Sequence, residues 1–340
     1  MNAFEFHCPT RIICGEHALH KLPVILVEMG VTKPLVVTDA NLVALGITDH
    51  AVHRLTEAGF PFAFYDQVPP DSSLSVVNDV AAIYEQEGCD GFIAFGGGSV
   101  IADEEAHEKL SYTSYKLVPH VAFLDPLLTA SLPPKLTATT GVDALTHAIE
   151  AYTSIQKNPV SDALARQAIA LIMENLVRSC EEPGDLDVRT SLALGSLLAG
   201  ASFSNAMVGI VHAIGHSLGG ICHIPHGQAM MILLPYCVRF NLERGHHAGL
   251  YGELLRALRP DLDKSSLTAE ERDILFSAAL FELNQYLHDH YDVPITLSQL
   301  GVERAILPKV ARQARYDGAA LYNKHEVTEE IALHILEEAY

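Results

Sequence analysis

Up to about Asp125, short β-branched runs alternate with amphipathic stretches, and this alternation constrains the fold more than any other feature. The runs "KPLVVTD", "FPFAFYD", "GFIAFGGG" and "HVAFLDP" are separated by segments with helical spacing, such as Ser73 to Glu87. Strands that alternate with helices in this way form a parallel sheet with helices on both faces. We therefore predict an α/β domain with a parallel sheet over residues 1–125.

From Pro126 onward the strand signals vanish. Segments rich in Ala, Leu and Glu follow, with apolar residues three and four apart. This pattern predicts a helical domain over residues 126–340, in which prolines such as Pro159 and Pro225 mark helix ends. At roughly 100–200 residues per domain, a chain of 340 residues is long enough for two domains with ample core.

The acidic composition argues against two classes of partner. The formal net charge is −20 at pH 7, from 42 acidic residues against 22 lysines and arginines. Nucleic acid and anionic membrane surfaces both require a basic face, and the sequence has no run of Lys or Arg. The start "MNAFEFHCPTRIICG" lacks the basic and apolar regions of a signal peptide, and the most apolar stretch, Leu192 to Ile214, is interrupted by polar residues. We expect a cytoplasmic protein with no nucleic-acid or membrane partner.

Two stretches of the helical part concentrate side chains that bind metals. In "GVDALTHAIEAY", Asp143 and His147 lie four apart and so project from one face of a helix. In "VGIVHAIGHSLGGICHIPHG", His212 and His216 have the same spacing, and His226 follows a glycine break that can turn the chain back. The alternative is that these are ordinary polar side chains of the helices with no shared site. However, imidazoles without hydrogen-bond partners in such an apolar segment would cost free energy of folding. The pattern predicts a shared metal site.

The chemical types of the predicted ligands restrict which metal ions the site would bind. One carboxylate with imidazoles and no thiolate suits Fe(II), Zn or Mn, and the residues alone do not choose among them. This set differs from a thiolate-rich structural zinc centre. A divalent ion held in this way, in a cleft between domains, would act as a Lewis acid that polarises a carbonyl or lowers the pKa of a bound alcohol.

These residues carry a specific resemblance. The stretches "GGGSVI", "LPPKLTATTGVDALTHAIEAYTS" and "VHAIGHSLGGICHIPHGQAMMILLP" resemble the iron-dependent (group III) alcohol dehydrogenases, and the likeness extends from "RIICGEHALHKL" to "ALHILEEAY". The resemblance implies a dehydroquinate synthase-like fold, with an N-terminal dinucleotide-binding α/β domain, an all-α C-terminal domain and the active site between them. It also implies hydride transfer between NAD(H) and a small primary alcohol or diol, or the matching aldehyde.

The resemblance further implies roles for individual residues of the helical domain. The implied metal is Fe²⁺, with Zn as the alternative, and its ligands are one aspartate and three histidines: Asp143, His147, His212 and His226. His216 matches the family's active-site histidine near the nicotinamide and is implied as catalytic, not as a ligand. Phe203 matches an aromatic residue that lines the substrate pocket, and His223 is left as a bystander.

The implied cofactor contacts lie in the α/β domain: Asp39, Gly96, Gly97, Gly98, Ser99 and Lys109. The turn Gly96–Ser99 matches the family's pyrophosphate-binding turn, although Ile101 stands where the G-x-G-x-x-G pattern has its third glycine. Asp39 matches a position near the adenine ribose, where a carboxylate bonds the hydroxyls and repels a 2′-phosphate. NAD(H) is therefore expected over NADP(H), the alternative being that Asp39 is only a turn residue at the end of a strand.

The sequence departs from the family pattern just after the glycine turn. Family members continue as GGGS-x-x-D-x-A-K through a helix and a Thr/Gly-rich segment, whereas here "ADEEAHEKL" follows and resembles a later loop of the family. A parallel crossover needs roughly a dozen or more residues, usually with a helix. We therefore expect either a chain that is discontinuous close to Ile101-Ala102 or a shortened family member with a damaged cofactor site.

Three alternatives to the main interpretation stay open. One is a glycerol-dehydrogenase-like polyol oxidoreductase that uses zinc, and another is a dehydroquinate-synthase-like lyase with the same architecture. The third is a catalytically silent homologue that lacks part of the cofactor site. Family members commonly pair through their N-terminal strands, and "FEFHCPTRIICG" is a candidate for such pairing, so we expect a homodimer or a larger homo-oligomer.

Overall fold

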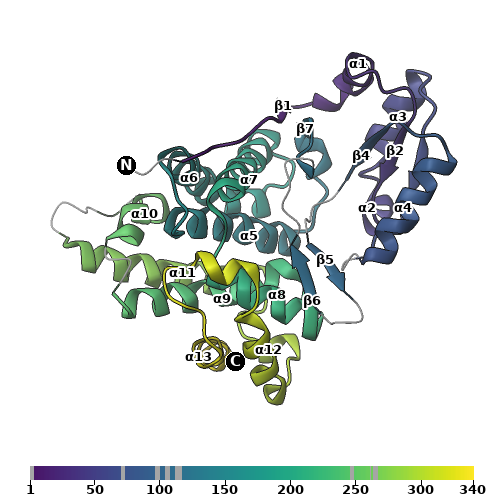
Figure 1. Cartoon of the computed structure of the whole chain (residues 1–340). Helices are drawn as coiled ribbons and strands as arrows, with labels where there is room; N and C mark the ends of the chain where they lie inside the picture. The colour runs from purple at the N-terminus through teal and green to yellow at the C-terminus, as the bar shows by residue number, and fades with distance from the viewer. Residues whose placement is uncertain are drawn as a thin grey trace. The chain divides into compact units, whose positions relative to one another are not determined.

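The computed structural model describes residues 4–69, 73–95, 100–103, 108–111, 117–245, 249–260, 262 and 267–340. The chain forms two compact units, an α/β unit of Pro9–Ser131 and a helical unit of Met1–Cys8 with Leu132–Tyr340 (Figure 1). The N-terminal segment is tied to the helical unit because the backbone N–H of His7 donates to Asn205 Oδ1 (2.7 Å) and the His7 carbonyl accepts from Asn205 Nδ2 (3.1 Å).

The α/β unit contains parallel strands with helices between them, as predicted. A three-stranded parallel sheet has the order β3-β2-β4, and a separate parallel pair joins β1 to β7. The strands are β1 (Arg11–Cys14), β2 (Pro34–Val37), β3 (Ala63–Tyr65), β4 (Gly91–Ala94) and β7 (Val121–Leu124). The helices are α1 (Leu22–Glu28), α2 (Ala40–Ala44), α3 (Asp49–Glu57) and α4 (Leu74–Gln86), with 3-10 turns η1 (Ala18–Lys21) and η3 (Pro126–Leu128).

Strand β2 shows that both faces of the three-stranded sheet are covered. Its neighbouring residues Leu35 and Val36 are both fully buried, and successive side chains of a strand point to opposite faces. Val36 packs in a cluster with Leu26 of α1 and Leu55 of α3, whereas Leu35 packs in a different cluster with Val80 of α4. Helices therefore cover both faces, as the alternation in the sequence indicated.

The stretch after the glycine turn differs from the expected loop. Val100–Asp103 and Glu108–Ser111 are strands β5 and β6, which pair antiparallel with Ile101 opposite Leu110. The β-branched pair Val100-Ile101 favours an extended backbone, and the ladder gives its peptide groups partners. Ile101 and Ala102 are consecutive residues of β5, opposite Leu110 and Lys109, and the two alternatives for this stretch stay predictions. The turn Gly96–Ser99 and the acids Glu104 and Glu105 lie outside the described residues.

The helical unit contains no strand among its described residues, as predicted from Pro126 onward. Its helices are α5 (Pro134–Thr153), α6 (Pro159–Glu181), α7 (Leu186–Ala206), α8 (Ile210–Cys222), α9 (His226–Glu243), α10 (Leu250–Leu258), α11 (Ala269–Tyr291), α12 (Leu307–Ala314) and α13 (Glu329–Glu338). The 3-10 turns are η4 (Ser298–Leu300), η5 (Arg304–Ile306) and η6 (Gly318–Tyr322). Helix α5 packs against α6, α7 and α9 and is largely buried, so its polar residues stand out.

Pro159 and Pro225 mark helix starts, not the predicted helix ends. Pro159 is the first residue of α6, and Pro225 immediately precedes α9. The first N–H of a helix has no intrahelical partner, so a proline, which lacks that N–H, is well tolerated there. These two prolines therefore predicted a helix boundary correctly, but each lies at the start of the next helix.

Helices α7 and α8 meet at a sharp bend of 101°. Met207 ends α7 with a left-handed φ of 66°, and α8 begins at Ile210. In the part of the chain that the structure describes, no single helix has the length and apolar composition needed to span a membrane, and this bent pair meets that criterion only when its two helices are taken together.

Candidate metal centre

Helix α5 supplies the first two side chains of the site. Asp143 and His147 lie one turn apart on it, as their spacing predicted, and both are half-buried among fully buried neighbours such as Val142 and Leu145. Glu150 lies a further turn along, and residues at i, i+4 and i+7 share one face of a helix. That face therefore carries three ionisable groups on a largely buried helix.

Helix α8 supplies His212 in its first turn. The bend at Met207 ends α7 and lets α8 start at Ile210, which places His212 where only 2% of its surface is exposed. His216 lies one turn later on the same helix and is also buried.

Helix α9 supplies His226 as its first residue, next to a glycine that permits close packing. A Cβ atom at Gly227 would lie 2.8 Å from the carbonyl oxygen of Thr139, which is a backbone atom of α5 and cannot easily move. Thr139 lies one turn before Asp143. The glycine therefore allows the start of α9 to approach α5, bringing His226 to Asp143.

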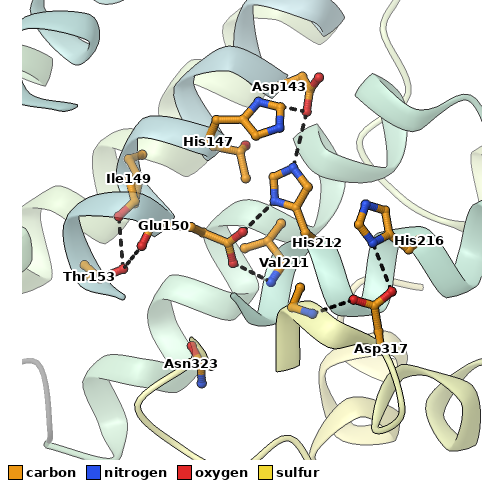
Figure 2. Close-up of polar contacts among 12 residues, drawn as sticks. Asp143, His147, Ile149, Glu150, Thr153, Val211, His212, His216, Asp317 and Asn323 are labelled. Atoms are coloured by element: carbon orange, nitrogen blue, oxygen red, sulfur yellow. Dashed lines mark hydrogen bonds and ion pairs between the residues drawn. The ribbon is translucent and has the colours of Figure 1, made fainter. Parts of the chain in front are cut away.

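The four predicted ligands converge on one point. One ligand atom from each of Asp143, His147, His212 and His226 can be chosen so that all four lie within 4.8 Å of one another. Asp143 Oδ1 lies 3.4 Å from His226 Nε2. It lies 3.8 Å from His212 Nε2, as Figure 2 shows. Helix α5 and the consecutive helices α8 and α9 thus place one carboxylate and three imidazoles around a common centre.

Two atoms at this centre are buried without a hydrogen-bond partner, Asp143 Oδ1 and His212 Nε2. A buried polar atom that lacks a partner costs about 1–3 kcal/mol, and native proteins rarely leave two such atoms facing each other. A divalent cation would satisfy both, since a carboxylate oxygen and an imidazole nitrogen are ordinary ligands of Fe, Zn and Mn. The residues present therefore fit a divalent metal ion.

The protonation states also suit a metal ion. Burial by itself would raise the pKa of Asp143, but the surrounding imidazoles, His147 first among them, outweigh burial and hold that pKa below its usual range. Burial lowers the pKa of His147, and it lowers the pKa of His212 well below its ordinary value, with repulsion between the imidazoles adding to the effect on His212. An ionised carboxylate and neutral imidazoles are the forms that bind metals.

His216 lies beside the centre but is not one of the four converging residues. Its ring stacks on that of His226 with centroids 5.5 Å apart, and its Nδ1 lies 3.0 Å from Asp317 Oδ2 (Figure 2). Asp317 is itself fixed, because its Oδ1 accepts from the N–H of Ala319 at 2.8 Å. The ring of His216 is therefore oriented by Asp317, which is not one of the four converging residues.

Two further residues named from the sequence have clear positions. Phe203 stacks on the ring of His147 with centroids 4.4 Å apart, so it packs against a predicted ligand. His223 ends α8 in a left-handed conformation, exposed and outside the converging group. The role of Phe203 in a substrate pocket stays a prediction.

The expected cofactor residues are described only in part. Asp39 follows β2 and caps α2, since its Oδ1 accepts from the N–H groups of Asn41 (2.8 Å) and Leu42 (3.0 Å). This is the structural role that the sequence left open as the alternative, and it leaves Oδ2 for a ligand. Gly96, Gly97, Gly98, Ser99 and the side chain of Lys109 lie outside the described residues.

Two carboxylates of the site were missed in the sequence. Glu150 lies 2.5 Å from Nδ1 of His212, and its signal was the i+7 spacing from Asp143. Asp317 had no such signal, because it lies 101 residues from His216 in the chain.

The fold and the site define a class of protein in which an α/β unit is joined to a helical unit that carries an aspartate–histidine metal centre. The chain belongs to the iron-containing alcohol dehydrogenase family. Residues 137–340 match the model of the "Fe-containing alcohol dehydrogenase family, C-terminal", and residues 9–102 match that of "Iron-containing alcohol dehydrogenase". This match confirms the family resemblance, the fold class and the oxidoreductase class predicted from the sequence.

Relatives in this family align along almost the whole chain. The 1,3-propanediol dehydrogenase of Klebsiella pneumoniae is 33% identical, with 99% of each chain covered. The NAD-dependent methanol dehydrogenase of Bacillus methanolicus is 28% identical over 98% of this chain and 99% of its own. A crystal structure of 1,3-propanediol oxidoreductase superposes with a TM-score of 0.91 at 30% identity, covering 100% of both chains.

The comparisons also bear on the departure after the glycine turn. The alignment with the Klebsiella dehydrogenase spans 395 positions, whereas this chain has 340 residues, so several dozen positions of that relative have no counterpart here. The two family models leave the segment between residues 102 and 137 unmatched. Both the discontinuous chain and the shortened family member account for these two observations.

Proposed function

We propose that this protein is a metal-dependent oxidoreductase that transfers a hydride between NAD(H) and a small primary alcohol or diol, or the matching aldehyde. The observation that carries the proposal is the convergence of one aspartate and three histidines in a chain of this family. Two relatives support the substrate class and the cofactor by name, a 1,3-propanediol dehydrogenase and an NAD-dependent methanol dehydrogenase.

The proposal assigns metal binding to four residues and proton exchange to a fifth. Asp143, His147, His212 and His226 hold a divalent ion, Fe²⁺ with Zn²⁺ as the alternative, which supplies Lewis-acid polarisation of the substrate oxygen. His216 is the catalytic histidine. Asp317 binds its Nδ1, which leaves Nε2 to exchange a proton with a substrate or with water.

The direct test is metal analysis of protein purified without oxygen, coupled to assays with a panel of small alcohols and aldehydes. We expect a stoichiometric divalent ion, whose identity decides between iron and zinc, and turnover with NAD(H) that a chelator removes and the metal restores. Turnover that survives complete metal removal would contradict the proposal.

A second candidate is a homologue that binds metal but does not turn over nicotinamide. The segment that relatives have and this chain lacks favours it, because the missing positions follow the glycine turn in the family pattern. Titration with NAD(H) separates the two candidates. The enzyme binds and turns over the cofactor, whereas the silent homologue binds the metal alone.

Cofactor choice is predicted to depend on the charge of Asp39. Asp39→Asn keeps a side chain that caps α2 but removes the negative charge, so the preference for NAD(H) over NADP(H) is expected to fall. The gain for NADP(H) is bounded by the repulsion removed, about 4 kcal/mol for unit charges about 4 Å apart near a surface. Kinetics with both cofactors measure it. An unchanged ratio of kcat/KM values would leave Asp39 as a helix cap alone.

Assembly and location remain predictions. We propose a homodimer or larger homo-oligomer in the cytoplasm. Light scattering and cell fractionation test these two points.

A further inference from the structure

A second buried carboxylate lies behind the metal centre. Glu150 is only 5% exposed, lies on the same face of α5 as Asp143 and His147, and is not one of the four converging residues. A buried carboxylate requires partners that compensate its charge. Its contacts therefore indicate what it does.

Glu150 contacts His212 through one oxygen and the start of α8 through the other. Its Oε2 lies 2.5 Å from His212 Nδ1, and its Oε1 accepts from the backbone N–H of Val211 at 2.7 Å (Figure 2). The N-cap of α8 is Gly209, which has no side chain to accept from the first-turn N–H groups. A side chain of α5 thus caps α8 and binds a histidine in that same first turn.

The close approach at Gly209 supports this arrangement. A Cβ atom there would lie 3.2 Å from Glu150 Oε1 and 3.3 Å from Asn323 Oδ1, which is tighter than ordinary packing. Gly209 at the N-cap therefore has no side chain that could cap α8, and its small size leaves room for the carboxylate of Glu150.

We propose that Glu150 is a positioning residue for the metal centre, and this inference rests on the metal site of the proposed function. By accepting the N–H of His212 Nδ1, it fixes the tautomer and the ring orientation that turn the Nε2 lone pair toward Asp143. The unpartnered state of Nε2 agrees with this assignment, since Nδ1 is engaged and Nε2 is free for a ligand bond.

Glu150 acts through His212 and does not touch the substrate. The cavity on its other side measures about 10 Å³ and is lined by residues such as Thr153, Asn241 and Tyr251. That volume is about the minimum for one water molecule and excludes an alcohol or a nicotinamide.

The discriminating variant is Glu150→Gln, which keeps the size and one acceptor. An amide offers one oxygen and one NH₂ group, so it cannot accept from both His212 Nδ1 and the N–H of Val211. If the amide oxygen faces His212 Nδ1, the NH₂ group faces the N–H of Val211 and two donors meet. If the amide oxygen faces Val211, the NH₂ group donates to Nδ1, and His212 must carry its proton on Nε2. We expect the affinity of the metal-free protein for Zn²⁺ or Co²⁺ to fall about 10–100-fold, with an altered Co²⁺ absorption spectrum.

Two matched variants separate positioning from general destabilisation. Asp185→Ala removes the cap of α7, where Asp185 Oδ1 accepts from the N–H groups of Asp187 and Val188 with no histidine involved. Asp317→Asn alters the partner of His216, which is not a ligand. Both are expected to bind Zn²⁺ and Co²⁺ with the affinity of the unaltered protein.

The measurements are chelator-competition titration with Zn²⁺, absorption spectroscopy with Co²⁺, and thermal melting of each metal-free protein. Unchanged affinity and spectrum in Glu150→Gln, with only a lower melting temperature, would overturn the inference and leave Glu150 as a helix cap. Failure of the unaltered protein to bind either ion would instead refute the metal site of the proposed function. The two failures are therefore distinguishable.

Discussion

Replacing His212 by alanine is expected to abolish metal binding and activity together. His212 is the most buried of the four converging residues, and its Nε2 is buried without a hydrogen-bond partner. Its removal deletes a ligand and also strips Glu150 of the ring it contacts. Because loss of an outer-shell partner alone typically costs 10–100-fold in metal affinity, loss of the ligand itself is expected to cost more. Metal content after anaerobic purification and turnover with NAD(H) are the two measurements.

The control for this variant lies on the same helix. His223→Asn alters an exposed histidine at the end of α8, in a left-handed conformation that asparagine tolerates. It is expected to keep both metal and activity. Metal content in His212→Ala equal to that of the control would show that the four residues are not a ligand set.

Replacing His216 by asparagine is expected to separate metal binding from turnover. Asparagine lacks the imidazole that would exchange the proton, but its amide can still donate a hydrogen bond to Asp317. The fold and the four converging residues are therefore expected to stay in place. A positioned acid or base contributes about 10²–10⁴-fold to rate, and a loss of kcat in this range is expected.

Metal analysis and the pH profile of kcat measure the two effects of His216→Asn. The metal content should be unchanged, and a pH dependence due to the imidazole should disappear. Loss of the metal in this variant would make His216 a ligand. Unchanged kcat would make it a packing residue.

The sequence predicted the parts of the structure that depend on short-range patterns. The runs around Leu35 and Ile93 became parallel strands, because β-branched and apolar residues favour an extended backbone; β2 is buried, whereas β4 has no buried residue. The spacing of Asp143 and His147 predicted one face of a helix, because four residues make about one turn.

Features that depend on long-range packing were beyond the sequence. Nothing near Asp317 indicates that it meets His216, since the two are joined only when η6 packs against α8. Glu150 was visible on the correct face of α5, but its role depends on the bend at Met207, which determines where α8 begins. The antiparallel pairing of β5 with β6 was not predicted from the sequence, because it joins residues on either side of an acidic segment.

The four proposed ligands come from three helices, so the proposed metal site couples folding to metal supply. In an unfolded chain only Asp143 and His147 lie near each other, and His212 and His226 join them once α8 and α9 have packed on α5. An ion that binds the folded state alone adds RT ln(1 + [L]/Kd) to the free energy of unfolding, about 2.7 kcal/mol at a hundredfold excess over Kd. A net stability of about 5–15 kcal/mol makes this a large share. In a metal-starved cell, the helical unit would therefore be exposed to proteases more often, and the amount of this protein would follow the supply of its ion.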